Sequence, residues 1–235
     1  LKLRNKDLRN YIDKFIFVSH WQANRFIEEY NLDKKRCNII HNGIGSTFEL
    51  VYDIQSVLVD KQPIICYTPS EDRGLDKLVD IYNKLKKINP EVRLHVFCNV
   101  KNKKIRKTKG IKVFGRLEHK ELIKELKKCL FWVYPVKKNE TFCINAIEAV
   151  ACGCIAITDS ESGIIEALEG SGVVAKGILE VLINMMILYK KDRKTLNDHI
   201  IDKYNFVIKN KIWSKSVEKF KNILTMNDKI MELHC

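Results

Sequence analysis

The stretch Leu130-Phe-Trp-Val-Tyr-Pro135, followed by Glu140-Thr-Phe-Cys-Ile-Asn-Ala-Ile-Glu148, decides the fold. Five apolar residues without polar alternation predict a strand covered on both faces, and Pro135 ends it. The run from Phe142 to Ala151 is apolar on nearly all sides, which is typical of a buried helix. A buried strand that turns into a buried helix is the repeating unit of an open α/β sheet.

Two carboxylates lie eight residues apart at this turn, Glu140 before the helix and Glu148 inside it. An unpaired carboxylate in a low-dielectric interior is costly, so Glu148 needs either a cation or a set of hydroxyl donors. Glu140 follows the carboxyl end of the strand, where open α/β sheets place their ligands. We therefore expect both carboxylates to face a binding cleft.

The rest of the chain repeats the same order of β-rich run, turn and amphipathic helix. Gly74–Ile88, for example, carries apolar residues at helical spacing and ends at Asn89-Pro90. This alternation predicts an α/β fold with a doubly wound, Rossmann-like parallel sheet. The expected strands are Lys14–Ser19, Asn38–His41, Pro63–Thr68, Arg93–Cys98, Gly110–Phe114, Leu130–Tyr134, Cys154–Thr158 and Gly172–Ala175. The expected helices are Trp21–Tyr30, Gly74–Ile88, Lys120–Leu130, Phe142–Ala151, Gly177–Tyr189, Arg193–Lys203 and Ile212–Leu224.

Length and charge limit the classes of protein and partner. A chain of 235 residues fits one large domain, or one domain with part of another. The net charge of +13 favours an anionic partner, and an anionic membrane surface remains open. The densest basic cluster, Lys101–Lys109, contains no aromatic residue, so we expect a solvated loop and no nucleic-acid partner.

Several other classes are disfavoured by what the sequence lacks. No apolar stretch approaches the roughly 18 residues that span a bilayer, and the polar N-terminus has no secretory pattern. Most of the eight cysteines fall in apolar runs, as expected of reduced, buried thiols, so we expect a cytoplasmic protein, either free or peripheral on a membrane. No dinucleotide fingerprint, Walker A sequence, Asp-x-Asp or histidine ligand spacing is present. We expect no metal and no cofactor.

The loop Pro69–Gly74 joins a predicted strand to a predicted helix. Helix N-termini receive phosphate readily, and Arg73 at that end would add a charged fork. The alternative is a surface arginine paired with Glu71 or Asp72. The turn Gly115–His119 has the same geometry after another strand, and its alternative is a plain connection.

Taken together, these residues resemble the donor-binding half of a GT-B glycosyltransferase, one of the retaining nucleotide-sugar enzymes of family 4. The resemblance is carried by the Glu-x7-Glu motif at Glu140 and Glu148 and extends from about Phe15 to Glu166. The surrounding motifs are Val18-Ser-His-Trp21, Ile40-His-Asn-Gly-Ile44, Asp72-Arg-Gly-Leu75, Phe114-Gly-Arg-Leu117 and Ala149-Val-Ala-Cys-Gly153.

The resemblance implies a division of the chain into three parts. Residues 1–45 would be the last strand–helix–strand unit of the acceptor-binding domain together with the hinge. Residues 46–211 would bind the nucleotide sugar, and residues 212–235 would form a helix that packs back towards the N-terminal domain. Because the first residue is leucine and most of the acceptor domain is missing, we expect a fragment.

The resemblance also implies residue roles. Glu148 would accept hydrogen bonds from the ribose hydroxyls, and Glu140 would stand by the sugar and stabilise positive charge at the anomeric carbon. Arg73 would neutralise the leaving diphosphate, the role that metal ions play in other transferases. The remaining donor-binding residues would be Ser70 and Gly74 in the loop before Leu75, Arg116 and Leu117 beside the base, and the backbone N–H groups of Thr141, Phe142 and Cys143.

Three departures from the family pattern concern the donor site. Pro69-Ser70 stands where many relatives have Gly-Arg, so one expected diphosphate cation is missing. Arg73 replaces a more usual lysine, and Thr141 and Cys143 stand where glycines are common.

The function implied is retaining transfer of a sugar from a nucleotide-diphosphate sugar to an unknown glycan, lipid or protein acceptor. The alternative is a non-catalytic nucleotide-sugar-binding or scaffold module, and a nucleotide-sugar epimerase of the same fold is a further enzyme option. By analogy with this family, we expect the chain alone to bind the donor, whereas transfer would also need an acceptor-binding domain.

Overall fold

The computed structural model describes residues 9–49 and 53–232. Within these residues a six-stranded parallel sheet has the order β5-β4-β3-β6-β7-β8. The order runs one way from β3 to β5 and the other way from β6 to β8, so the expected doubly wound sheet is confirmed. Its strands are β3 (Gln62–Tyr67), β4 (Arg93–Val96), β5 (Ile111–Val113), β6 (Cys129–Tyr134), β7 (Ile155–Thr158) and β8 (Val173–Val174).

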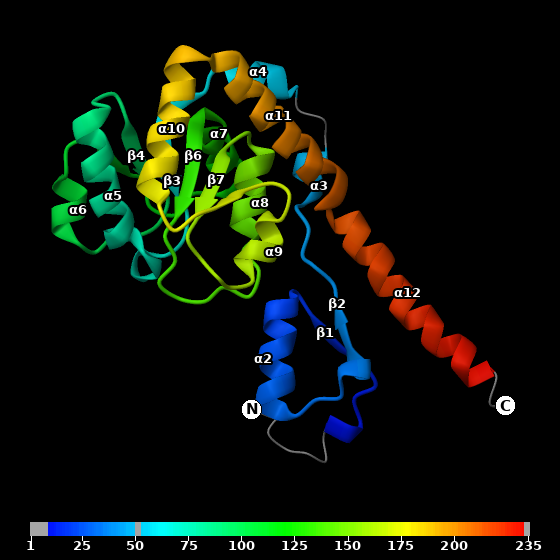
Figure 1. The fold of residues 1–235 in the computed structure, drawn as a ribbon. Coiled ribbons are helices and arrows are strands. Elements are labelled where there is room, and N and C mark those ends of the chain that lie inside the picture. Colours follow the sequence, from blue (N-terminus) through cyan, green and yellow to red (C-terminus); the bar gives the residue numbers. More distant parts are fainter. Residues whose placement is uncertain (1–8, 50–52, 233–235) are drawn as a thin grey trace.

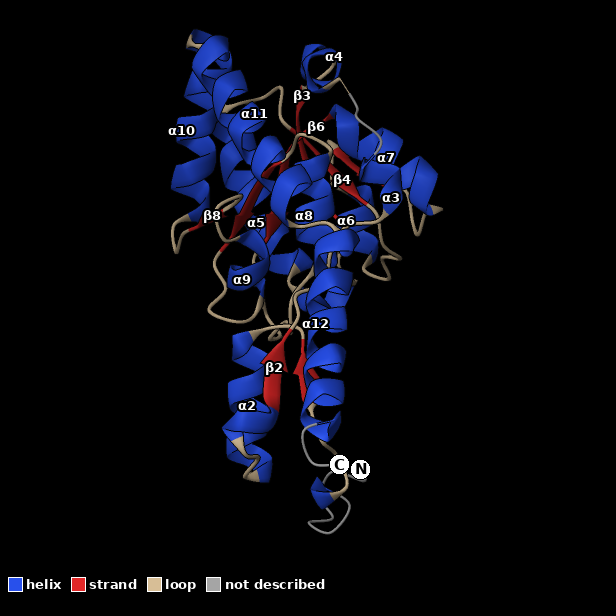
Figure 2. Ribbon diagram, turned by 90° about the vertical axis from the view of Figure 1, so that its right-hand side faces the viewer, coloured by secondary structure: helices blue, strands red, loops and turns tan. Residues whose placement is uncertain are grey.

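Helices cover both faces of this sheet. In Figure 2, α5 (Leu75–Ile88) and α10 (Ile178–Lys191) lie on one side of it and α7 (His119–Lys128) lies on the other. All six residues of β6 are buried, as its apolar sequence predicted. Further helices are α8 (Ile144–Ala151), α9 (Ile164–Leu168) and α11 (Arg193–Asn210).

A smaller unit precedes the sheet. Strands β1 (Phe15–Phe17) and β2 (Cys37–Ile39) pair in parallel beside α2 (His20–Tyr30), and the 3-10 helix η2 (Lys34–Arg36) precedes β2. Its own hydrophobic cluster has the buried residues Phe15, Phe17, Ala23 and Leu32. Helix α12 (Trp213–Glu232) runs from the main body towards this unit (Figure 1).

Three short stretches differ from the sequence expectation. The cluster Lys101–Lys109, expected as a loop, contains helix α6 (Lys103–Lys107), capped by the Asn102 side chain on the Lys104 N–H at 2.9 Å. The unpatterned stretch before Lys61 contains α3 (Ser46–Glu49) and α4 (Ile54–Val59), and the short α9 was also not expected. These helices are too short to show a helical period, because one or two turns bury only a few residues.

A buried lysine joins the end of α4 to the main sheet. Lys61 is 3% exposed, and its Nζ donates to the carbonyl oxygens of Leu126 at 3.2 Å, Cys129 at 2.6 Å and Cys152 at 2.7 Å. Three carbonyl acceptors satisfy the ammonium group without a carboxylate. Among the described cysteines none is in a disulfide, and Cys66, Cys98, Cys129, Cys152 and Cys154 are buried, as expected; Cys235 lies outside the described residues.

Candidate functional site

The loops that follow β3 and β6 meet at the carboxyl edge of the sheet, where the strand order reverses. The first loop holds the 3-10 helix η3 (Glu71–Arg73) and Gly74. The φ of Gly74 is 129°, a backbone conformation that glycine adopts readily and other residues rarely adopt. A Cβ on Gly74 would lie 1.9 Å from the Pro135 carbonyl oxygen, and the Lys137 N–H donates to the Arg73 carbonyl at 3.2 Å. Gly74 therefore lets the two loops touch at the position where open α/β sheets bind ligands.

Arg73 and Glu140 come together across this contact. The Arg73 guanidinium pairs with Glu140 Oε1, and the Tyr134 hydroxyl donates to the same oxygen at 2.7 Å. Burial, and then the Glu140 carboxylate, raise the pKa of Tyr134, so its hydroxyl stays a hydrogen-bond donor. The alternative pairing of Arg73 with Glu71 or Asp72 is wrong: Asp72 pairs with Lys138, and Glu71 accepts the Lys101 and Asn102 N–H groups.

The backbone around Glu140 is held from the loop after β7. The Glu140 N–H donates to Ser162 Oγ at 3.1 Å, and the Gly163 N–H donates to the Glu140 carbonyl at 2.9 Å. A Cβ on Gly163 would lie 2.1 Å from the Thr141 carbonyl oxygen, so this approach also requires glycine. The carboxylate is therefore fixed on two sides, by its backbone and by its side chain.

Helix α8 begins at Ile144, two residues later than expected. Cys143 is its N-cap residue, with a φ of 82° that residues other than glycine rarely adopt. Burial raises the pKa of the Cys143 thiol to about 12, so the side chain is neutral. Within the described residues, the N–H groups of Thr141, Phe142 and Cys143 donate to no acceptor. Free N–H groups at a helix N-terminus are suited to an anionic group.

Glu148 finds a partner that the sequence did not identify. Its side chain is 13% exposed, and Oε1 lies 3.0 Å from His119 Nε2. Burial raises the pKa of Glu148, and the charge and hydrogen bond of His119 oppose this effect. Where the sequence led us to expect a cation or hydroxyl donors beside Glu148, the structure places the imidazole of His119. Its only signal in the sequence was the turn Gly115–His119.

A cavity of about 840 Å³ lies next to this pair. Three of the expected donor-binding residues, Ser70, Arg116 and Leu117, line it together with His119, the partner of Glu148. The other expected site residues are not among its lining residues: Arg73, Gly74, Glu140, Thr141, Phe142, Cys143 and Glu148. The remaining lining residues, which the sequence did not indicate, are Thr68, Phe97, Cys98, Asn99, Glu118, Leu122 and Asn145.

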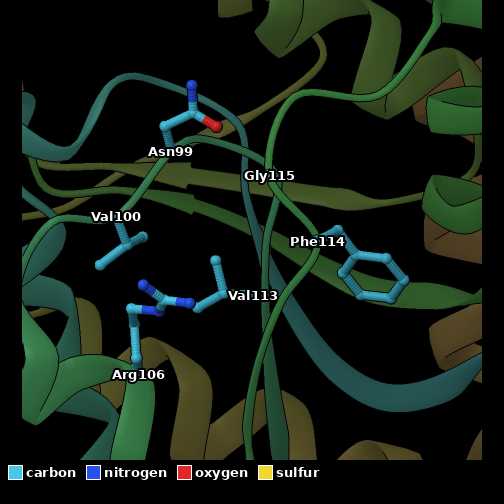
Figure 3. Close-up of a pocket in the computed structure, with 6 residues that line it drawn as sticks. All are labelled: Asn99, Val100, Arg106, Val113, Phe114 and Gly115. Carbon is cyan, nitrogen blue, oxygen red and sulfur yellow. The ribbon is translucent and has the colours of Figure 1, made fainter.

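A second cavity of about 440 Å³ adjoins the first, because Asn99 lines both. Figure 3 shows Arg106 of α6 with its guanidinium between the side chains of Val100 and Val113. Helix α6 therefore brings a cation from the basic cluster to this end of the sheet.

Two other expectations concern membrane spans and metal ions. No helix of the described residues has the length and apolar character to cross a membrane. No group of three or more His, Cys, Asp or Glu side chains within these same residues could hold a metal ion, and metal independence stays a prediction.

The family model described as "Glycosyl transferases group 1" matches residues 52–202 of the chain. This range contains both cavities, the Arg73–Glu140 pair and Glu148. The chain belongs to the group 1 glycosyl transferases. A search of curated proteins finds no match for this group 1 chain.

Solved structures with the same fold are GT-B glycosyltransferases. HepE of Anabaena, in complex with UDP and glucose, has a TM-score of 0.72 at 14% identity and covers 92% of this chain. WaaG, a glycosyltransferase of lipopolysaccharide biosynthesis, has a TM-score of 0.71 at 15% identity over 90% of it. Sucrose-phosphate synthase of Thermosynechococcus elongatus has a TM-score of 0.67 at 16% identity and covers 95% of this chain. The chain covers only 64%, 62% and 61% of these three proteins, respectively.

Proposed function

We propose that this chain binds a nucleotide-diphosphate sugar and forms the donor half of a retaining, metal-independent glycosyltransferase of family 4. The observation that carries the proposal is the contact between Arg73 and Glu140, from the loops after β3 and β6, beside a cavity that Ser70, Arg116 and Leu117 line. The UDP and glucose bound to HepE support a nucleotide sugar as the ligand.

Each group has a role in this proposal. The Glu148 carboxylate accepts hydrogen bonds from the ribose hydroxyls. His119, whose Nε2 lies 3.0 Å from Glu148 Oε1, holds the carboxylate in place. The free N–H groups of Thr141, Phe142 and Cys143 receive the diphosphate or sugar at the positive end of α8.

Arg73 changes partners when the donor binds. In the free protein its charge is neutralised by Glu140, and the diphosphate competes for the same guanidinium. Glu140 is then available to the developing positive charge at the anomeric carbon, while Tyr134 still donates to it at 2.7 Å.

The three-part division of the chain belongs to the same proposal. Residues 46–211 bind the donor, residues 1–45 are the end of an acceptor-binding domain, and residues 212–235 return towards it. The acceptor, a glycan, lipid or protein, would bind mainly to the part of the molecule that this chain lacks relative to HepE.

The first prediction tests the ribose contact. UDP-, GDP- and ADP-sugars are screened by thermal shift, and the nucleotide at about 100 times its Kd should stabilise the chain by about 2.7 kcal/mol, or roughly 5–10 °C. Glu148→Gln keeps the shape of the side chain but removes the charge, so we expect affinity to fall by about tenfold or more.

Glu121→Gln is the matched control, because Glu121 is exposed on α7 and pairs only with Lys124. This variant should keep the full shift. Equal nucleotide affinity in Glu148→Gln and Glu121→Gln would overturn the proposed donor site.

A further inference from the structure

A separate cavity of about 260 Å³ lies where the chain passes from the N-terminal unit into the main body. It is lined from the loop after β2, from the α9 end and from the junction of α11 with α12. Its charged lining consists of three lysines, one glutamate and one histidine. The lining residues used below are His41, Glu169, Lys211, Lys215, Ser216 and Lys219.

The positive charges of this cavity outnumber the negative ones among the described residues. Among the described residues, no carboxylate lies within ion-pair distance of Lys211, Lys215 or Lys219. Glu169 offsets one of the three lysine charges, and Glu166, whose carboxylate lies 3.2 Å from His41 Nε2, offsets a second, which leaves one in excess with neutral His41. Uncompensated charge in a concave site attracts anions, because low-dielectric walls focus the field.

Lys211 differs from an ordinary surface lysine. It is 8% exposed, and its Nζ donates to the Glu166 carbonyl at 2.9 Å. An ammonium group carries three donors, so two remain for other acceptors. Burial lowers the pKa of Lys211, and Lys219 lowers it further, whereas Glu169 and Glu166 raise it. The interior therefore holds this cation at a cost that a bound anion would relieve.

His41 lies between these lysines and the Glu166 carboxylate. Burial lowers its pKa first, then Lys211 and, more weakly, Lys219, while the hydrogen bond and charge of Glu166 raise it. The ring of His41 also packs on that of Phe142 at 5.3 Å between centroids. The lysine cluster thus lies one side chain away from the loop that carries Glu140.

We propose that His41, Lys211, Lys215 and Lys219 form a binding site for a phosphate group, either free or carried on a small sugar. The Ser216 hydroxyl, which donates to the His41 carbonyl at 2.6 Å, holds the loop after β2 against α12 at this site. The phosphate would accept hydrogen bonds from the ammonium groups and bridge α12 to the loop after β2. The site is distinct from the proposed nucleotide-sugar cavity and does not depend on it.

Thermal shift with inorganic phosphate and with a hexose 6-phosphate tests the site, each against sodium chloride of equal ionic strength. We expect saturable stabilisation by at least one of them, and the better ligand identifies whether the phosphate is free or sugar-borne. The double variant Lys215→Ala, Lys219→Ala should bind that ligand at least about tenfold more weakly. Both lysines are exposed on α12, so the fold should survive.

Lys221→Ala is the matched control, since Lys221 is exposed on the same helix but does not line the cavity. Glu148→Gln should leave phosphate binding intact, and the double lysine variant should leave nucleotide binding intact, so the two proposals fail separately. As a second readout, phosphate should raise the pKa of His41 in an NMR titration. The His41 resonance is assigned from its absence in His41→Gln. Stabilisation no greater than that by chloride, or equal binding by the double variant and Lys221→Ala, would overturn the site.

Discussion

The Glu148 carboxylate is 13% exposed and contacts one imidazole, that of His119, at 3.0 Å. Burial raises its pKa, so the folded chain holds this proton more tightly than the unfolded chain does. Protonated Glu148 therefore stabilises the fold below its ordinary pKa, and this contribution is lost as the pH rises through the raised value. At neutral pH the ionised group opposes folding, although the proposed ribose contact requires it.

Replacing this carboxylate should stabilise the ligand-free protein. Glu148→Gln keeps a hydrogen-bond partner for His119 and removes the buried charge. We expect the melting temperature to rise by about 2–4 °C at pH 7.5, as about 1 kcal/mol gives in a chain of this size, and to change little at pH 4. Differential scanning calorimetry at both pH values measures this. A lower melting temperature at pH 7.5 would mean that the ion pair with His119 outweighs desolvation.

Single residues were predicted from the sequence where chemistry alone identifies them. Glu148 stood out because a carboxylate in an apolar helix needs a partner, and Arg73 because it ends a strand-to-helix loop. Tyr134 and His119 were not predicted as partners, since their contacts depend on where separate strands and turns lie in space. The positive φ of Cys143 had one sign in the sequence, since Cys143 stands where glycine is common in the resembled family.

Between elements, the principal link is the cap that α9 provides for α2. The Glu166 carboxylate accepts the His20 N–H at 2.7 Å and the Trp21 N–H at 2.8 Å, the first two N–H groups of α2. Ser19 Oγ accepts the next one, from Gln22, at 3.0 Å. A side chain of the main body thus satisfies N–H groups that a helix leaves free, and it favours the positive end of the dipole.

Glu166→Ala should loosen α2 without affecting the main sheet. Loss of an N-terminal cap costs about 0.5–2 kcal/mol, so we expect the amide exchange of His20 and Trp21 to accelerate by about two- to thirtyfold. Hydrogen exchange followed by NMR measures both amides, and residues of β6 serve as the internal reference. Ser19→Ala is the matched variant, because it removes a cap within α2 and leaves the link to α9 in place. Unchanged exchange at His20 and Trp21 in Glu166→Ala would contradict the cap.

Long elements were predictable and short ones were not. Helix α5 shows a clear helical period because it buries one long face, and strand β6 is a continuous apolar run because it is buried throughout. Helix α6 buries only Ile105, so five lysine-rich residues read as a loop. The role of Glu166 could not be predicted, since the contact joins residues 146 positions apart.

In the whole molecule, the described residues form two separate hydrophobic clusters. The main one spans Ile44 to Val207 and includes the strands of the six-stranded sheet, whereas the N-terminal one has four buried residues. A two-stranded sheet with one helix buries little apolar surface, so its own contribution to stability is small. The alternation of strand and helix carries no information on which elements share a core, so the expectation that residues 1–45 stand apart came from the family resemblance.

We therefore expect the two clusters to unfold separately in urea. Trp21 lies on α2, and Trp132 lies in β6 with its Nε1 donating to Thr68 at 2.8 Å. In 19F NMR of the chain labelled with fluorotryptophan, the Trp21 resonance should reach its midpoint at a lower urea concentration than the Trp132 resonance. Trp→Phe variants assign the signals.

The nucleotide that binds best should then raise the Trp132 midpoint and leave the Trp21 midpoint in place, because a ligand stabilises only the unit that holds it. Glu148→Gln should remove this selective rise. Coincident midpoints for the two resonances, with or without nucleotide, would show instead that the Glu166 cap and α12 couple both clusters into a single cooperative unit.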